Sequence, residues 1–265
     1  MKSKLKLKIN GESPRSLLFA LVLSSFNCDV YIFDFFLNND SFNNDQIFSL
    51  TNFSRNLLIK FDIWNKFEEI TYSFNSVKFK DNLVSDQFLL RNKNFSENHS
   101  NTFGWITKYS AFKNLLINKL NNLDNVHFIS KDELNDVSQI FDFEFNFKSY
   151  EEYPLSVFKR VDTQSIIFNA YLRGNVQKRL YKINTTDGLL ILTPINKNLY
   201  QIKWNDAPIQ LKERSRYSRS FFLDNLTILL PNELKVDQII GDVNFLDVSD
   251  ISSTYIIKNR SIYFN

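Results

Sequence analysis

The first 34 residues follow an order of secondary structure that constrains the fold strongly. Residues 5–10 (LKLKIN) alternate as a strand does, and residues 11–14 (GESP) follow as a break with proline at a plausible first helical position. Residues 15–26 are largely apolar, which predicts a helix covered on several sides, with Leu17, Leu21 and Val22 fully buried. Residues 29–34 (DVYIFD) predict a second strand ending on an acidic residue. This order within about 30 residues predicts a βαβ unit.

The rest of the chain mixes helices with a series of strands. Helices are predicted over 51–60, 62–69, 105–122 and 208–230, with short helical pieces to 240. Strands are predicted as a pair within 70–92 and at 125–130, 141–147, 154–162, 164–172, 178–184, 188–195, 198–204 and 254–264. Because the two kinds of structure interleave, the sequence predicts an α/β fold in which two domains share the chain.

Composition excludes several classes of protein. The 265 residues are 43% apolar, enough for a core, and a net charge of +3 is too small to indicate a nucleic-acid partner. A single cysteine excludes a disulfide framework, and two histidines without a second cysteine argue against a zinc site. No apolar run is long enough for a transmembrane segment and no signal peptide is recognisable, so we expect a soluble, cytoplasmic protein. Five glycines, where about 19 are usual, leave few for a phosphate-binding loop.

Other polar features have an ordinary explanation beside a functional one. The acidic pairs at 68–69 and 151–152 are typical of a solvated surface, and Cys28 is typical of a small buried hydrophobe. Neither His99 nor His127 has a companion for catalysis. Residues 211–219 (LKERSRYSR) place four cations around a tyrosine, which predicts either an exposed helix face or peripheral contact with phosphate or an anionic membrane surface.

Four segments fall in the order of one family's motifs: residues 11–16 (GESPRS), 50–64 (LTNFSRNLLIKFDIW), 188–204 (GLLILTPINKNLYQIKW) and 254–265 (TYIIKNRSIYFN). Together they resemble the flavin-dependent aromatic-ring hydroxylases, and most closely the ubiquinone-biosynthesis hydroxylase branch. The family's counterparts are G-G-G-P-A-G, A-L-S-x-x-S-x-x-L-L-x-x-L-G-x-W, G-P-x-A-L-L-P-L…S-x-V-W and the strand before G-D-A-A-H. The resemblance covers nearly the whole chain.

This resemblance implies a partial FAD-binding, Rossmann-like domain of the glutathione-reductase type, interleaved with an antiparallel-sheet substrate domain. The cofactor domain would comprise residues 1–70 and 103–150 with the terminal strand 251–265, and the substrate domain 71–102 and 151–250. FAD would be the cofactor and NAD(P)H its reductant. The residual FAD-binding positions would be Gly11, Pro14 and Asp34.

The first turn departs from the family pattern. Its first glycine is kept as Gly11, whereas Ser13 and Ser16 replace the second and third. A Cβ at the second position obstructs the pyrophosphate, and serine disfavours the positive φ that glycine permits. Glu12 adds negative charge where an anion should bind, and Arg15 can offset that charge without restoring the space.

Further cofactor contacts are also weakened. Asp34 is a shorter stand-in for the ribose-binding glutamate, or an ordinary charged strand end. Gln46 stands where the family's D-R-A-I-A-L stretch has the arginine that reaches the flavin. The D-G motif is unmatched in residues 141–152 (FDFEFNFKSYEE), and the sequence ends at Asn265, where the G-D motif would begin.

We therefore expect a relative of the FAD monooxygenases of polyprenyl-quinone synthesis that is no longer catalytic, carries no stoichiometric FAD and has a scaffold or binding role. Two alternatives stay open: an active FAD-dependent monooxygenase whose missing C-terminal part is supplied elsewhere, and a decaying reading frame. Expected partners are quinone-pathway proteins or a second copy. Either would dock where residues 255–264 form a strand without the family's covering helix.

Overall fold

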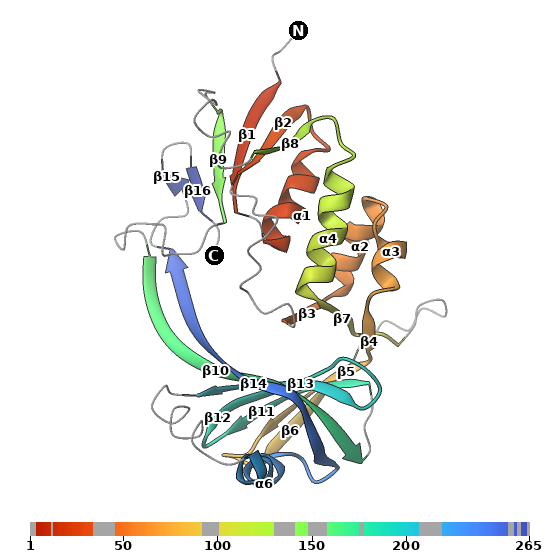
Figure 1. Ribbon diagram of the computed structural model, residues 1–265, viewed down its shortest axis with the longest axis vertical. Helices are drawn as coiled ribbons and strands as arrows, with labels where there is room; N and C mark the ends of the chain where they lie inside the picture. Colours follow the sequence, from red (N-terminus) through yellow and green to blue (C-terminus); the bar gives the residue numbers. More distant parts are fainter. Residues whose placement is uncertain are drawn as a thin grey trace.

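The computed structural model describes residues 4–11, 13–33, 46–91, 101–129, 141–147, 158–174, 178–206, 219–253, 257–258 and 261–263. Figure 1 shows a parallel sheet with helices at one end of the molecule and a large, curved, mainly antiparallel sheet at the other. A three-stranded sheet lies in space between these two sheets. The fold is therefore mixed α/β, as the sequence predicts.

The six-stranded sheet has the order β15-β16-β9-β1-β2-β8. Its members are β1 (Leu5–Asn10), β2 (Cys28–Phe33), β8 (Val126–Ile129), β9 (Phe143–Asn146), β15 (Ile257–Lys258) and β16 (Ser261–Tyr263). All neighbours pair in parallel except β15 with β16. The predicted βαβ unit is confirmed, and the last predicted strand is instead a short hairpin.

Four helices accompany this sheet. They are α1 (Pro14–Leu23), α2 (Asn52–Lys60), α3 (Trp64–Glu68) and α4 (Tyr109–Leu120). Leu17 and Leu21 of α1 are fully buried, as predicted. The prediction for Val22 is wrong, because that side chain is only partly buried at the end of the helix. The helix also ends three residues earlier than predicted, where Ser24 and Ser25 bond carbonyl oxygens of its last turn.

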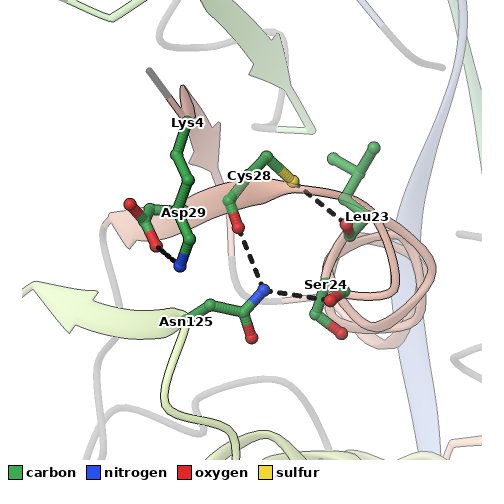
Figure 2. Close-up of polar contacts among 6 residues, drawn as sticks. All are labelled: Lys4, Leu23, Ser24, Cys28, Asp29 and Asn125. Atoms are coloured by element: carbon green, nitrogen blue, oxygen red, sulfur yellow. Dashed lines mark hydrogen bonds and ion pairs between the residues drawn. The ribbon is translucent and has the colours of Figure 1, made fainter. Parts of the chain in front are cut away.

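The turn from α1 to β2 is fixed by a side chain from a distant part of the chain (Figure 2). The Asn125 amide nitrogen donates to the carbonyl oxygens of Ser24 and Cys28, each at 2.9 Å. The Cys28 thiol donates to the Leu23 carbonyl oxygen, and burial raises the pKa of that thiol. Cys28 is thus a packed side chain of the turn, as the sequence indicates.

The three-stranded sheet has the order β3-β7-β4, with β3 (Ile47–Leu50), β7 (Gly104–Lys108) and β4 (Tyr72–Phe74). The prediction of helix from residue 105 is wrong, because residues 104–108 form β7 and the helix begins at Tyr109. Trp105 and Ile106 are adjacent and both buried, as in a strand that is buried on both faces. Apolar residues in such a short run also fit a helical spacing, so the sequence pattern does not distinguish a strand from a helix here. A side chain at Gly104 would meet the Phe74 ring at 2.7 Å, so these strands pack closely.

The seven-stranded sheet has the order β14-β10-β13-β12-β11-β5-β6. Its members are β5 (Ser76–Asp81), β6 (Asp86–Arg91), β10 (Phe158–Gly174), β11 (Arg179–Thr185), β12 (Gly188–Pro194), β13 (Leu199–Asp206) and β14 (Leu234–Ser253). Only β5 and β11 pair in parallel. The antiparallel sheet that the sequence predicts is confirmed.

Two predictions in this sheet are wrong. Residues 158–174 form one long strand where the sequence predicts two, and residues 234–253 form β14 where short helical pieces were expected to 240. Strands β10 and β14 pair along most of their length, with register shifts between Ile167 and Asn169 and between Tyr171 and Leu172 of β10. Such bulges interrupt the two-residue alternation from which a strand is recognised.

Helix α6 (Arg219–Leu229) covers one face of this sheet, as Figure 1 shows. The first part of the predicted helix over 208–230 lies outside the described residues. Trp204 and Phe168 contact Phe222 of α6 across the core. Each end of the molecule thus has its own core, one around α1 and α4 and one between α6 and the seven-stranded sheet.

Candidate functional site

The turn from β1 to α1 lies at the carboxyl end of the central parallel strand. One neighbour of β1 is β2, the next strand along the chain, and the other is β9, which follows much later. Such a reversal of strand order opens a crevice at the carboxyl ends of parallel strands, where open α/β sheets bind ligands. The turn therefore occupies the position where a dinucleotide's pyrophosphate would be expected.

Gly11 has the conformation and the surroundings that require a glycine. Its φ of +118° is one that other residues rarely adopt. A side chain at Gly11 would also meet Phe147, at the end of β9, at 3.1 Å. The Phe147 N–H donates to the Asn10 carbonyl oxygen at 2.8 Å, which holds β9 against the turn. The protein's own chain therefore uses the space beside this glycine.

Ser13 is the N-cap of α1. Its φ of −69° and ψ of 155° are extended, so the expected conflict between serine and a positive φ does not arise. Its hydroxyl oxygen accepts the Ser16 N–H at 3.2 Å, and its carbonyl oxygen accepts the Leu17 N–H at 3.0 Å. Pro14, buried at the first helical position, has no N–H. Of the donors that a helix start can offer an anion, the Ser16 N–H is thus bonded internally, and Pro14 has none to offer.

Ser16 fills the contact between helix and strand where the family has its third glycine. Its side chain is completely buried. The hydroxyl lies 2.7 Å from the Ser13 carbonyl oxygen and 2.9 Å from that of Gly11, and it donates its one hydrogen to this pair. The Ser16 hydroxyl therefore bonds the backbone of the turn itself. The close packing of helix against strand, which was expected to need glycine, is achieved with this small, hydrogen-bonded side chain.

A polar cluster that the sequence analysis did not identify lies beside the turn. Asn10 and Asn146 end two neighbouring strands, and both are buried. The Asn10 amide nitrogen donates to the Asn146 side-chain oxygen at 2.6 Å and to a Glu144 carboxylate oxygen at 2.5 Å. Lys8 pairs with the same carboxylate at 3.1 Å. Both strands alternate apolar with charged residues, so the signal available in the sequence was only that each of them ends on an asparagine.

The remaining candidate residues either lie outside the described residues or are engaged in other contacts. Asp34 lies outside the described residues, as do Glu12, His99 and the basic stretch at 211–218. Gln46 contributes its carbonyl oxygen, which accepts the Tyr109 N–H at 2.8 Å. His127 lies on β8 with its ring against Tyr31. Among the residues that the structure describes, no group of three or more potential metal ligands occurs, and no helix is long and apolar enough to cross a membrane.

No family model matches the sequence, and no curated protein matches it either. Solved structures do match, at low sequence identity. The flavin-dependent halogenase CmlS superimposes with a TM-score of 0.73 at 14% identity, over 99% of this chain and 53% of the other. The myxobacterial chondrochloren halogenase CndH gives a TM-score of 0.69 at 12% identity, over 98% and 68%. The p-nitrophenol 4-monooxygenase of Pseudomonas putida gives 0.64 at 11% identity, over 99% and 72%.

The chain thus has the FAD-binding fold of flavin-dependent monooxygenases and halogenases. Both the parallel sheet and the large antiparallel sheet belong to the match, since nearly the whole chain is covered. The chain spans between about half and three quarters of the length of these structures. At such identities the likeness concerns the fold.

Proposed function

We propose that this protein is a relative of the FAD-dependent monooxygenases that has lost stoichiometric FAD and has a binding or scaffold role. The observation that carries the proposal is the internally bonded turn between β1 and α1. Ser13 and Ser16 place side chains where the family has glycines, and their hydroxyls bond the turn's own N–H and carbonyl groups. The residues present therefore do not fit a pyrophosphate as a glycine turn does.

The neighbouring strand supports the same proposal. Phe147 lies against Gly11, and the buried amides of Asn10 and Asn146 bond each other. These groups stabilise the carboxyl edge of the sheet without a ligand. Displacing them to make room for a pyrophosphate would break hydrogen bonds that the chain makes by itself, at a cost of about 1–3 kcal/mol for each buried group left unpaired.

The role in ubiquinone or polyprenyl-quinone synthesis rests on the sequence resemblance of all four segments named above, of which residues 50–64 and 188–204 are the two longest. In the structure these two segments form α2 with its flanks and the β12–β13 hairpin. We propose a quinone precursor, or a protein of that pathway, as the binding partner. A cytoplasmic location with peripheral membrane contact, and a division into the cofactor and substrate domains described above, belong to the same proposal.

An active FAD monooxygenase with NAD(P)H as reductant is the second candidate. It is favoured by what the turn retains: the left-handed Gly11, a proline at the first helical position and the complete βαβ unit. A decaying reading frame fits less well. Across the described residues only two buried side-chain atoms, Asn169 Oδ1 and the Tyr181 hydroxyl, lack a hydrogen-bond partner, as expected for a maintained core.

The flavin content of the purified full chain tests the proposal. The protein should be expressed with excess riboflavin, and its visible absorbance compared with its protein concentration. We expect far less than one flavin per chain, and no NAD(P)H oxidation above that of buffer with free FAD. A yellow protein with about one flavin per chain would contradict the proposal and support the active monooxygenase.

A further inference from the structure

One of the two outer strands of the seven-stranded sheet, β6, exposes apolar side chains. All six residues of β6 (Asp86–Arg91, DQFLLR) are exposed. Phe88 is 55% exposed, Leu90 44% and Leu89 36%, and Leu83 and Val84 in the preceding turn are more exposed still. Figure 1 shows β6 at the end of the molecule away from the parallel sheet. The strand therefore presents apolar side chains on both of its faces.

The edge of this strand is open for pairing. Its inner edge pairs with β5 in unbroken register from Ser76 with Arg91 to Asp81 with Asp86. Within the described ranges, no strand pairs with its outer edge. Natural edge strands are commonly protected by a lysine, a proline or a bulge. The sequence of β6 contains neither residue, its two charged residues, Asp86 and Arg91, stand only at its ends, and its pairing with β5 contains no bulge.

The strand is also held in place before any partner arrives. The rings of Phe79 and Phe88 stack with centroids 4.5 Å apart and planes within 7° of each other. In the turn, an Asp81 carboxylate oxygen accepts the Leu83 N–H, and the Asn82 amide donates to the Leu229 carbonyl oxygen of α6. A preorganised edge loses little conformational entropy when it pairs.

We propose that two copies of this chain associate through β6, which pairs antiparallel with its twin so that the seven-stranded sheets become one continuous sheet. The dimer is two-fold symmetric, with Leu89 of each copy on the axis. This interface is independent of whether the protein binds flavin, and it is distinct from the terminal strand at 255–264.

Symmetry restricts the possible registers. A two-fold axis normal to the sheet keeps each side chain on its own face, and opposed residues in a sheet must share a face. Residue numbers that face each other must therefore sum to an even value, so that one residue faces its own twin on the axis. Parallel pairing about a two-fold axis would place opposed side chains on opposite faces, and is excluded.

The sequence of β6 selects among these registers. Centred on Leu89, the pairing sets Phe88 against Leu90 of the other copy, Leu89 against Leu89, and Gln87 against Arg91, so that apolar residues meet and the polar pair can bond. Centred on Phe88, the same strand would set Asp86 against Leu90 and desolvate a carboxylate. Of these two registers, only the one centred on Leu89 places every apolar residue of β6 opposite an apolar residue.

A cysteine crosslink tests both the dimer and its register. Leu89→Cys should form an intermolecular disulfide under mild oxidation of the full chain, because opposed residues lie within disulfide reach. Gln87→Cys is the matched control: in this register its twin lies four residues further along, roughly 13 Å away. The native Cys28 is buried, and the parent chain reports any contribution from it. Equal crosslinking of both variants, or none of Leu89→Cys, would overturn the proposal.

Sedimentation equilibrium supplies a test without oxidant. The parent chain should show a monomer–dimer equilibrium at micromolar concentrations. Leu89→Lys should raise the dissociation constant at least about tenfold, because two cations then face each other on the axis. Ile228→Lys, at a 79% exposed position of α6, should leave it unchanged. A parent chain that stays monomeric at the highest attainable concentration, or a higher assembly that Leu89→Lys leaves intact, would contradict the proposal.

Discussion

Replacing Ser16 tests whether the turn between β1 and α1 stabilises the fold or is built to bind the pyrophosphate of a cofactor. In a working pyrophosphate turn, glycine at this position should favour the ligand and leave the fold intact. Here the buried Ser16 hydroxyl bonds the carbonyl oxygens of Ser13 and Gly11. Ser16→Ala removes that bond and leaves a buried acceptor, at a cost of about 1–3 kcal/mol. Ser16→Gly adds the backbone freedom of glycine, roughly 0.5–1 kcal/mol more.

Thermal unfolding of the parent and both variants measures these costs. For a chain of this size, each kcal/mol lowers Tm by about 2–4 °C, so Ser16→Ala should lose roughly 2–12 °C and Ser16→Gly somewhat more. Ser25→Ala is the matched control, since the exposed Ser25 hydroxyl makes the same type of bond to the carbonyl oxygen three residues earlier in α1. It should change Tm little. A Ser16→Gly variant as stable as the parent would refute the structural role of this serine.

Three further predictions concern the same fold. Leu21→Ala should cost about 2–5 kcal/mol in the free energy of unfolding, measured with denaturant, because Leu21 is 1% exposed; an unchanged stability would remove it from the core. Gly11→Ala should lower Tm, because a side chain meets Phe147 at 3.1 Å in a left-handed backbone; an unchanged Tm would contradict this strain. Burial raises the pKa of Glu233, but the hydrogen bonds to its carboxylate, first of all the one from Lys78, and the positive charges of Lys78 and Arg179 together outweigh burial and leave the pKa below its usual range. Lys78→Met should therefore lower Tm at neutral pH, and the difference should vanish as the pH falls through that lowered pKa; a difference that persists in acid would contradict the pairing.

The sequence predicted those parts of the fold whose signals are local. The βαβ opening could be recognised because alternation, a turn with proline and an apolar helix follow one another within 34 residues. Strand β7 was missed because Trp105 and Ile106 also fit a helical spacing that continues into α4. Strand β14 was missed because its bulges against β10 disturb the alternation. In both cases tertiary pairing decided between states that local sequence allowed.

The candidate site could be located from the sequence, but its internal bonding could not. The family pattern placed Gly11 and Pro14 at the turn, and the structure puts them there. Because the family has a glycine at the position of Ser13, the sequence analysis predicted a conflict between serine and a positive φ. In the structure Ser13 is instead the N-cap of α1 with an extended backbone. The role of Phe147 depends on the pairing of β9 with β1 across more than 130 residues, which no local pattern reveals.

Titration of the full chain with FAD tests the central claim most directly. Flavin fluorescence would be followed at tens of micromolar protein, for the parent chain and for a variant carrying both Ser13→Gly and Ser16→Gly. The account predicts no saturable, stoichiometric binding by the parent, and no tight binding by the variant, because Phe147 and the Asn10–Asn146 pair still occupy the edge of the sheet. Saturation at about one FAD per parent chain would contradict it.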